Sequence, residues 1–212
     1  AADWLFGTTE GVEIFPLPVC CDRFFFDEKK RGALRRKMGV DGQTVYLHVG
    51  RFMDVKNHAF LIRVFEEIHR RQPDSVLMLV GDGELRPEIE ARVRQAGLEN
   101  SVVFWGNVSD VADKMMAADA MIFPSKYEGF PTVLLEAQAA GLDAFISDSI
   151  TPEIALTGRI HPVSLRESAQ AWAETVLQTR RAPDRAADNA VIRARYDVSA
   201  AAERLTQIYT RP

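Results

Sequence analysis

Short apolar runs alternate along this chain with longer stretches in which the apolar residues recur at helical spacing. Such short runs are typical of buried strands, and the longer stretches have the period of amphipathic helices. In 59–68, for example, the apolar side chains fall on one helical face. The pattern predicts strands over 12–15, 45–49, 76–80, 102–104, 120–123, 144–146 and 160–163, and helices over 27–38, 59–68, 87–96, 111–117, 131–140, 169–179, 184–195 and 198–209.

Strands that alternate with helices predict an α/β fold built on a doubly wound parallel sheet of the Rossmann-like type. All strands of such a sheet end at the same edge, and ligands bind in the crevice outside their carboxyl ends. The loops that follow the predicted strands are therefore candidates for a binding site. These loops carry Gly50 with Arg51, Gly81 with Asp82 and Gly83, Trp105 with Asn107 and Val108, and Glu128 with Gly129 and Phe130.

The stretch that follows the predicted strand 120–123 is central to this site. A loop with Glu128, Gly129 and Phe130 leads to Pro131 and Thr132, where a helix begins. Proline suits the first turn of a helix because an N–H at that position would have no partner within the helix. A helix that begins after a glycine turn presents free backbone N–H groups, which bind anions. We expect the residues from Gly129 to Thr132 to bind a phosphate group.

Two carboxylates flank this helix start: Glu128 lies in the loop, and Glu136 lies about one turn into the helix. At ~1.5 Å per residue, the second carboxylate is roughly 6 Å along the helix axis. A carboxylate beside a bound phosphate is suited to accept hydrogen bonds from neutral hydroxyls, such as those of a sugar. The alternative is that both glutamates are solvated surface residues, since short motifs produce many false matches.

Arg51 and Lys56 would place two positive charges on the same edge of the sheet. Arginine can hold two phosphate oxygens at once and lysine acts as a point charge, so the pair could clamp a diphosphate. Taken singly, each could equally be a solvated surface charge. The segment 81–83 could be a bare turn, and Trp105 could be an aromatic residue at the edge of the core or a neighbour of a nucleotide base.

Composition limits the classes of partner. Among 212 residues, 47% are hydrophobic and 26% are charged, and the net charge of -4 offers no general attraction to nucleic acid or to an anionic membrane. No apolar run has the length of a transmembrane helix, and no leader-peptide pattern occurs. Cys20 and Cys21 are adjacent, with Cα atoms ~3.8 Å apart, which is too close for an ordinary disulfide. We expect them to be free thiols in a reducing cytoplasm.

The order of these motifs resembles the C-terminal donor-binding domain of the glycosyltransferase family 4 enzymes, which have the two-domain GT-B fold. The resemblance runs over about 45–146 and includes the paired-glutamate motif of that family at Glu128 and Glu136. Segments 57–58, 85–89 and 136–141 are most similar to the bacterial exopolysaccharide transferases of the family. The resemblance implies a retaining enzyme that transfers a hexosyl group from a UDP-sugar to a polysaccharide or lipid-linked acceptor.

The resemblance also implies a role for each matched residue. Arg51 and Lys56 would hold the donor diphosphate, Glu128 would face the transferred sugar, and Glu136 would accept hydrogen bonds from the ribose hydroxyls. No metal would be required, and the chain has no Asp-x-Asp pair of the kind that holds Mg²⁺ beneath a diphosphate. The other implied donor-binding residues are Gly50, Gly129, Phe130, Pro131 and Thr132 at the diphosphate, and Asp82, Gly83, Trp105, Asn107 and Val108 at the base.

The same resemblance implies a domain organisation. Residues 1–16 would be the end of an acceptor-binding domain and the linker, 17–195 would be the nucleotide-sugar-binding domain, and 196–212 would be a helix that packs toward the acceptor domain. We expect the chain to lack most of that acceptor domain, and therefore to bind the donor without turnover. Two departures from the family pattern are Asp143, where a proline is usual, and the linker 16–19, where a Pro-Asn-Gly sequence is usual.

The expected location is the cytoplasm, with the full-length protein peripheral at the inner face of the membrane. Two alternatives to a transferase stay open. A sugar-nucleotide epimerase shares the GT-B architecture and would act on the donor without an acceptor. A regulatory module could also keep the nucleotide pocket without catalysis.

Overall fold

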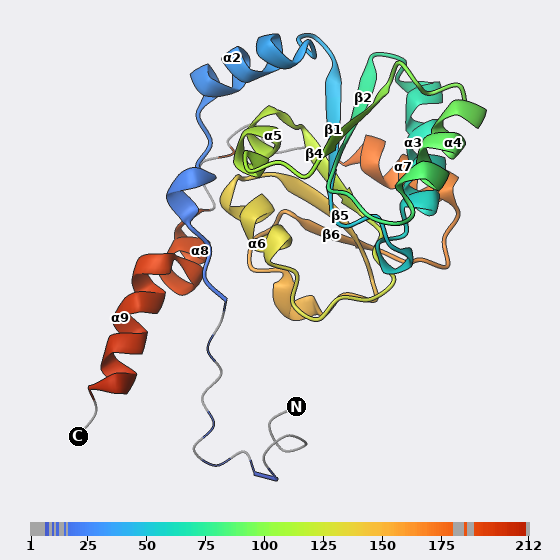
Figure 1. The fold of residues 1–212 in the computed structure, drawn as a ribbon. Helices are drawn as coiled ribbons and strands as arrows, with labels where there is room; N and C mark the ends of the chain where they lie inside the picture. The colour runs from blue at the N-terminus through green and yellow to red at the C-terminus, as the bar shows by residue number, and fades with distance from the viewer. Residues whose placement is uncertain are drawn as a thin grey trace.

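The computed structural model describes residues 7–8, 10, 12, 15, 17–179, 185 and 189–210. Within this part of the chain, six strands form one parallel sheet in the order β3-β2-β1-β4-β5-β6, with helices on both faces (Figure 1). The doubly wound sheet predicted from the sequence is therefore confirmed. The strands are β1 (Thr44–Val49), β2 (Ser75–Val80), β3 (Val102–Gly106), β4 (Ala120–Phe123), β5 (Asp143–Ser147) and β6 (Ile160–Val163).

The helices agree with the predicted ones to within a few residues, apart from one segment. The predicted helix 184–195 is found as a helix from Asn189, and its predicted start lies largely outside the described residues. Of the predicted strand 12–15, residues 13 and 14 lie outside the described part, and Val12 and Phe15 are not in a strand. The helices are η1 (Cys21–Arg23), α2 (Glu28–Met38), η2 (Asp54–Lys56), α3 (His58–Arg71), α4 (Arg86–Gln95), α5 (Val111–Ala117), α6 (Thr132–Ala139), η3 (Pro152–Ile154), α7 (Ala169–Gln178), α8 (Asn189–Tyr196) and α9 (Val198–Tyr209).

Two hydrophobic clusters cover the two faces of the sheet. Leu47 on β1 points into a cluster that includes Leu134 of α6 and Ile192 of α8. Tyr46, the residue before Leu47 on β1, points into the cluster on the other face of the sheet, which includes Phe65 of α3 and Val93 of α4. Because both faces are buried, the central strands are mostly apolar and do not alternate with polar residues; His48 on β1 is the exception that is used at the site.

The direction in which strands are added reverses between β1 and β4, which lie side by side at the centre of the sheet. Every strand pair is parallel, so the carboxyl ends of all the strands share one edge, as predicted. In open sheets of this order, ligands bind at the crevice beside such a reversal point. The loops that follow β1 and β4 therefore occupy the favoured position for a ligand.

Asp143, the departure from the family pattern, has a structural partner. Its side chain is buried at the start of β5, and its Oδ1 lies 2.8 Å from His161 Nε2 on β6. Arg159 lies beside the other carboxylate oxygen, at 3.6 Å. The polar residue is thus accommodated by hydrogen bonding and opposite charge, as a buried carboxylate requires.

Cys20 and Cys21 are both free thiols, as predicted. Cys20 is exposed and Cys21 is buried, and burial raises the pKa of the Cys21 thiol to about 12. A buried thiol with such a pKa is unreactive at neutral pH.

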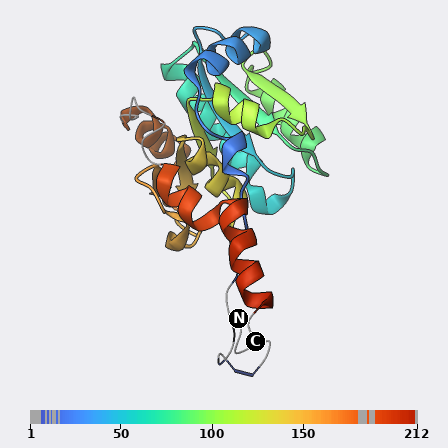
Figure 2. The same ribbon diagram turned by 90° about the vertical axis from the view of Figure 1, so that its left-hand side faces the viewer.

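The C-terminal helix α9 projects away from the rest of the structure (Figures 1 and 2). It follows α8 directly, after a bend at Asp197, and none of its residues is buried. Large apolar side chains on it are exposed, namely Val198, Leu205 and Tyr209. Among the described helices, none is long and apolar enough to cross a membrane.

Candidate functional site

The loops that follow β1 and β4 are joined at the reversal point of the sheet. Asn57 donates from Nδ2 to the carbonyl of Pro124 at 3.1 Å, and the Lys126 N–H donates to the carbonyl of Val55 at 2.7 Å. The Lys126 ammonium also pairs with Asp54 at 2.6 Å. These contacts hold the two loops as one unit, although about seventy residues separate them in sequence.

Asn57 has a special backbone conformation at this junction. Its φ is 57°, the one positive value at a non-glycine residue in the part of the chain that the structure describes. Asparagine tolerates this left-handed conformation better than most residues, because its short side chain can hydrogen-bond nearby. The residue ends η2 and begins α3, so the chain turns between Lys56 and His58.

Lys56 and Glu128 meet across the joined loops. The ammonium lies 2.6 Å from Glu128 Oε1, and only 17% of the Lys56 side chain and 13% of the Glu128 side chain are exposed. The ammonium also lies 5.0 Å from the centre of the Phe123 ring, within the range of a cation–π contact. Of the two alternatives for Lys56, a clamp residue or a solvated surface charge, the low exposure argues against the solvated charge.

Two buried histidines lie beneath this ion pair, and sequence reasoning assigned neither of them to the site. His48 Nδ1 is 2.9 Å from the carbonyl oxygen of Ile122, so this nitrogen carries the proton and donates. The His58 ring stacks on Phe52 at 4.1 Å and meets His48 edge-on at 4.6 Å. Burial, followed by the nearby Lys56 charge, lowers the pKa of His58 to about 4. For His48, the sequence signal was its position as a polar residue inside the apolar run 45–49.

The other predicted phosphate ligand, Arg51, is separate from this pair. Its side chain is 71% exposed, and its ionic contact is with Glu84 at 3.8 Å. It follows Gly50, and a side chain added at Gly50 would lie 3.0 Å from His48 Nε2. A residue without a side chain at position 50 thus avoids a close contact with His48.

Asp82 and Gly83 bring the loop after β2 against the loop after β1. The Phe52 N–H donates to the Asp82 carbonyl at 3.0 Å, and the Asp82 side chain accepts from the Gly83 N–H at 2.8 Å. A side chain at Gly81, whose φ is 127°, would collide with the backbone of Gly50. Glycine is therefore needed at this position so that the two loops can approach each other closely. The segment 81–83 is thus more than a turn, which was the alternative left open by the sequence.

On the base side, Trp105 packs against the core and carries Lys114 on one ring face, with the ammonium 3.8 Å from the ring centre. Lys114 is buried and pairs with Asp110 at 2.9 Å. These contacts place Trp105 at the edge of the core, and its expected position beside a nucleotide base stays a prediction. Asn107 is exposed and Val108 is half-buried beside the same core.

The helix start after β4 has the predicted form. Pro131 precedes Thr132, the first residue of α6, and no side chain caps the N-terminal N–H groups. Gly129 is exposed. Phe130, by contrast, is half-buried and stacks on Tyr196 of α8, with ring centres 6.1 Å apart. The backbone N–H groups of this segment are thus free for an anion, while the Phe130 side chain anchors the loop to the core.

Glu136 lies in α6 and is half-buried. Burial raises the pKa of its carboxyl, and the charge of Arg23 opposes this shift. Arg23, on η1, also donates from Nη2 to the carbonyl of Ser109 at 3.1 Å, in the loop after β3. Sequence reasoning missed Arg23, because nothing local marks an arginine that lies 86 residues before its hydrogen-bond partner.

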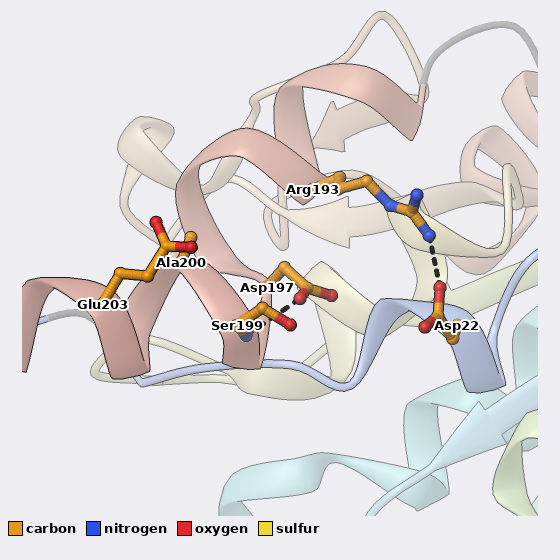
Figure 3. A pocket seen from close by; sticks show the side chains of 6 residues that line it. All are labelled: Asp22, Arg193, Asp197, Ser199, Ala200 and Glu203. Carbon is orange, nitrogen blue, oxygen red and sulfur yellow. Dashed lines mark hydrogen bonds and ion pairs between the residues drawn. The ribbon is translucent and has the colours of Figure 1, made fainter.

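A polar pocket lies outside this group of loops, between η1 and the bend from α8 to α9 (Figure 3). Its volume is about 320 Å³. None of the residues predicted for the site lines it, so the pocket is not the predicted donor site. The residues that line it are Asp22, Arg193, Asp197, Ser199, Ala200 and Glu203.

Comparison with known proteins places this geometry in a family. Residues 43–181 match the family model described as glycosyl transferases group 1. The chain is 36% identical to the putative glycosyltransferase EpsF of Bacillus subtilis, over 84% of this chain and 48% of the relative. It is 30% identical to a GDP-mannose-dependent alpha-(1-6)-phosphatidylinositol monomannoside mannosyltransferase of Mycolicibacterium smegmatis, over 73% of this chain and 43% of the relative.

The fold is also shared with solved structures. The Anabaena protein HepE, crystallised with UDP and glucose, superposes with a TM-score of 0.82 at 20% identity, over 99% of this chain and 59% of that one. The likeness confirms a Rossmann-like half of a GT-B fold. The chain spans about half the length of the curated relatives it matches. On its matching residues and its fold, the chain belongs to the glycosyl transferases group 1 family.

Proposed function

We propose that this chain is the donor-binding half of a retaining glycosyltransferase, which moves a hexosyl group from a UDP-sugar to a polysaccharide or lipid-linked acceptor. The observation that carries the proposal is the pairing of Lys56 with Glu128 across the joined loops. A lysine ammonium has three N–H donors, so Lys56 can keep Glu128 and still donate to a diphosphate. The free N–H groups at the start of α6 lie in the adjoining segment and add to the same anion site.

The remaining residues would complete the donor site. Arg51 would turn from solvent onto the diphosphate, Glu128 would contact the transferred sugar, and Glu136 would accept hydrogen bonds from the ribose hydroxyls. In the transfer step, the bond from the sugar to the diphosphate would break, a bond to the acceptor hydroxyl oxygen would form on the same face of the sugar, and the hydroxyl proton would pass to the departing diphosphate. Fixed positive charges and helix N–H groups would stabilise the leaving diphosphate, without need of a metal.

UDP as the donor nucleotide is supported by the HepE structure, which holds UDP and glucose. The mycobacterial relative, however, is described as GDP-mannose-dependent. The role in exopolysaccharide synthesis is supported by the resemblance to EpsF. Competition among UDP, GDP and ADP for this chain tests the base directly, and a preference for GDP would overturn the assignment of UDP.

The acceptor domain is proposed as the partner of the C-terminal helix. The apolar side chains of α9 that are exposed here, Val198, Leu205 and Tyr209, would be covered by that domain in the complete protein. The boundary of 17–195 with 196–212 would then lie at the bend between α8 and α9. A cytoplasmic enzyme, peripheral at the inner face of the membrane, would have access to lipid-linked acceptors.

Millimolar UDP is expected to raise the unfolding temperature of this chain by about 2–4 °C, the shift that follows from ~1 kcal/mol of ligand stabilisation in a domain of this size. The pocket lies within one domain, so the acceptor domain is not needed for the effect. Thermal unfolding followed by circular dichroism, with and without EDTA, measures it. A scan with no shift, or a shift that EDTA removes, would contradict the proposed donor site or its independence from metal.

Glu136→Gln is expected to weaken uridine and UDP by the same factor, roughly five- to tenfold, because the lost hydrogen bonds are to ribose and a charged acceptor contributes about 1–1.5 kcal/mol more than a neutral one. Isothermal calorimetry with both ligands measures the two factors. Glu203→Gln, an exposed carboxylate on α9, is the control. A loss confined to UDP would show that Glu136 acts at the phosphates and not at the ribose.

A further inference from the structure

Two segments from opposite ends of the chain are joined beside the site. Val19 donates from its N–H to the Tyr196 carbonyl at 2.7 Å, and the Val198 N–H donates to the Val19 carbonyl at 3.1 Å. The Cys21 N–H donates to Asp197 Oδ2 at 3.2 Å. We call residues 19–23 together with 196–198 the linker–elbow unit. Figure 3 shows the ion pair between Asp22 and Arg193 that closes the same junction.

The linker–elbow unit contacts the donor site first through Tyr196. This side chain is 6% exposed, and its ring lies nearly parallel to that of Phe130, at an angle of 20°. Phe130 is flanked by Gly129, which has no side chain, and by Pro131, which precedes α6. The Phe130 ring therefore attaches the helix start to the core. Removal of the Tyr196 ring would free the segment that presents N–H groups to the diphosphate.

The second contact is made by Arg23, with the loop that follows β3. Its guanidinium is bound to the Ser109 carbonyl in the loop after β3, next to Asn107 and Val108. Its charge also acts on Glu136 in α6. Arg23 thus hydrogen-bonds the loop assigned to the base, and its charge favours the ionised form of the carboxylate assigned to the ribose.

We propose that Tyr196 and Arg23 are positioning residues for the donor: Tyr196 holds the phosphate-binding segment through Phe130, and Arg23 holds the base loop beside Glu136. The linker–elbow unit is then a part of the donor site, although its segments lie near the two ends of the proposed 17–195 domain. If the linker–elbow unit served only the stability of the fold, contacts with core residues such as Cys21 and Ile192 would be enough. The contacts with Phe130 and Ser109 serve the loops at the carboxyl edge of the sheet. This inference rests on the proposed donor binding.

Calorimetry of UDP with variants of this chain tests the Tyr196 contact. Tyr196→Ala is expected to weaken UDP about tenfold, because small displacements of a preorganised site are costly, whereas Tyr196→Phe keeps the ring and should bind as the wild type does. Ile192→Ala, on the same helix and fully buried, is the matched control. It should lower the unfolding temperature at least as much as Tyr196→Ala and leave UDP affinity unchanged well below that temperature.

The same experiment tests Arg23. Arg23→Ala is expected to weaken UDP about threefold, on the scale of one exposed charge contact, and Arg23→Lys should recover part of the loss. Arg36→Ala, an exposed arginine on α2, is the control and should have no effect.

The outcomes separate the two levels of inference. If the wild-type chain binds no UDP, the proposed function fails. If the wild type binds UDP and the Tyr196 and Arg23 variants behave as their controls do, the positioning roles alone are overturned. The same holds if Tyr196→Phe loses as much affinity as Tyr196→Ala, because the stacking contact would then not be the cause.

Discussion

Lys56→Ala is expected to weaken UDP binding by about 100-fold, or ~3 kcal/mol, and to leave uridine binding nearly unchanged. A charge-assisted hydrogen bond to the diphosphate contributes about 1.5–3 kcal/mol. Its loss would also leave the Glu128 carboxylate, with 13% of the side chain exposed, without its partner and facing the phosphates. The effect should therefore reach the upper end of that range. Isothermal calorimetry with UDP and uridine measures both affinities.

A double-mutant cycle separates the two contributions to this loss. Lys56→Ala with Glu128→Ala should bind UDP more tightly than Lys56→Ala alone, because the unpaired carboxylate is gone. Glu128→Ala alone should keep UDP binding, and in the complete two-domain enzyme it should impair sugar transfer. Lys126→Ala is the matched control, since this lysine lies in the same joined loops and pairs with the exposed Asp54. Equal losses for UDP and uridine in Lys56→Ala would show that Lys56 acts through the fold and not on phosphate.

Acid is expected to destabilise the protein through His58, by about 2.5 kcal/mol between about pH 7 and about pH 4.5. The pKa of His58 is lowered from 6.5 to about 4, first by burial and then by the Lys56 charge. Between these two pKa values, His58 binds a proton in the unfolded chain but not in the folded protein. The free energy of unfolding therefore falls as the pH is lowered through this range. His48, fully buried, has its pKa lowered in the same direction.

Urea unfolding of the wild type and of His58→Phe at the two pH values measures this contribution. The variant keeps a ring on Phe52 and cannot titrate, so the difference in unfolding free energy between the two proteins should shift by about 2.5 kcal/mol toward the variant at the lower pH. His58→Gln is a second variant without a titrating ring, in case phenylalanine is too large for the space. Parallel loss of stability with pH in all three proteins would contradict the assignment to His58.

The local pattern of residues was sufficient for the elements and for the order of the motifs. The short apolar runs of β1, β2 and β4 are typical of strands that are buried on both faces of a sheet, so the positions of these strands were predictable. The placement of Glu128 in a loop and of Glu136 in the following helix also depends on near neighbours, here Gly129 and Pro131. For the same reason, the joint pattern from Gly50 to Glu136 was enough to indicate the family.

Contacts between distant segments were decided by the tertiary structure. Lys56 pairs with Glu128 only because β1 and β4 are adjacent at the reversal of the sheet, and no local pattern reports strand order. From the sequence alone, a solvated surface charge therefore stayed open as an alternative for this lysine, since most lysines are exposed. His48 was predicted only as part of a strand, and His58 lay just before a predicted helix. Their lowered pKa values arise from burial between elements that are far apart in the chain, which no local pattern reports.

The roles of residues in the linker–elbow unit were also not predictable from the sequence, because they depend on contacts between distant segments. Arg23 and Tyr196 carry no motif, and each acquires its contact from a segment that the fold brings beside it, Ser109 in one case and Phe130 in the other. For Trp105 the sequence left two environments open, because an aromatic residue at a strand end can pack against a nucleotide base or against the core. The position of Lys114 on its ring depends on how α5 packs. By itself the sequence thus determined the elements, the motifs and the family, because these depend on short-range order. The partners of each charge and ring were decided only by the packing of the whole chain.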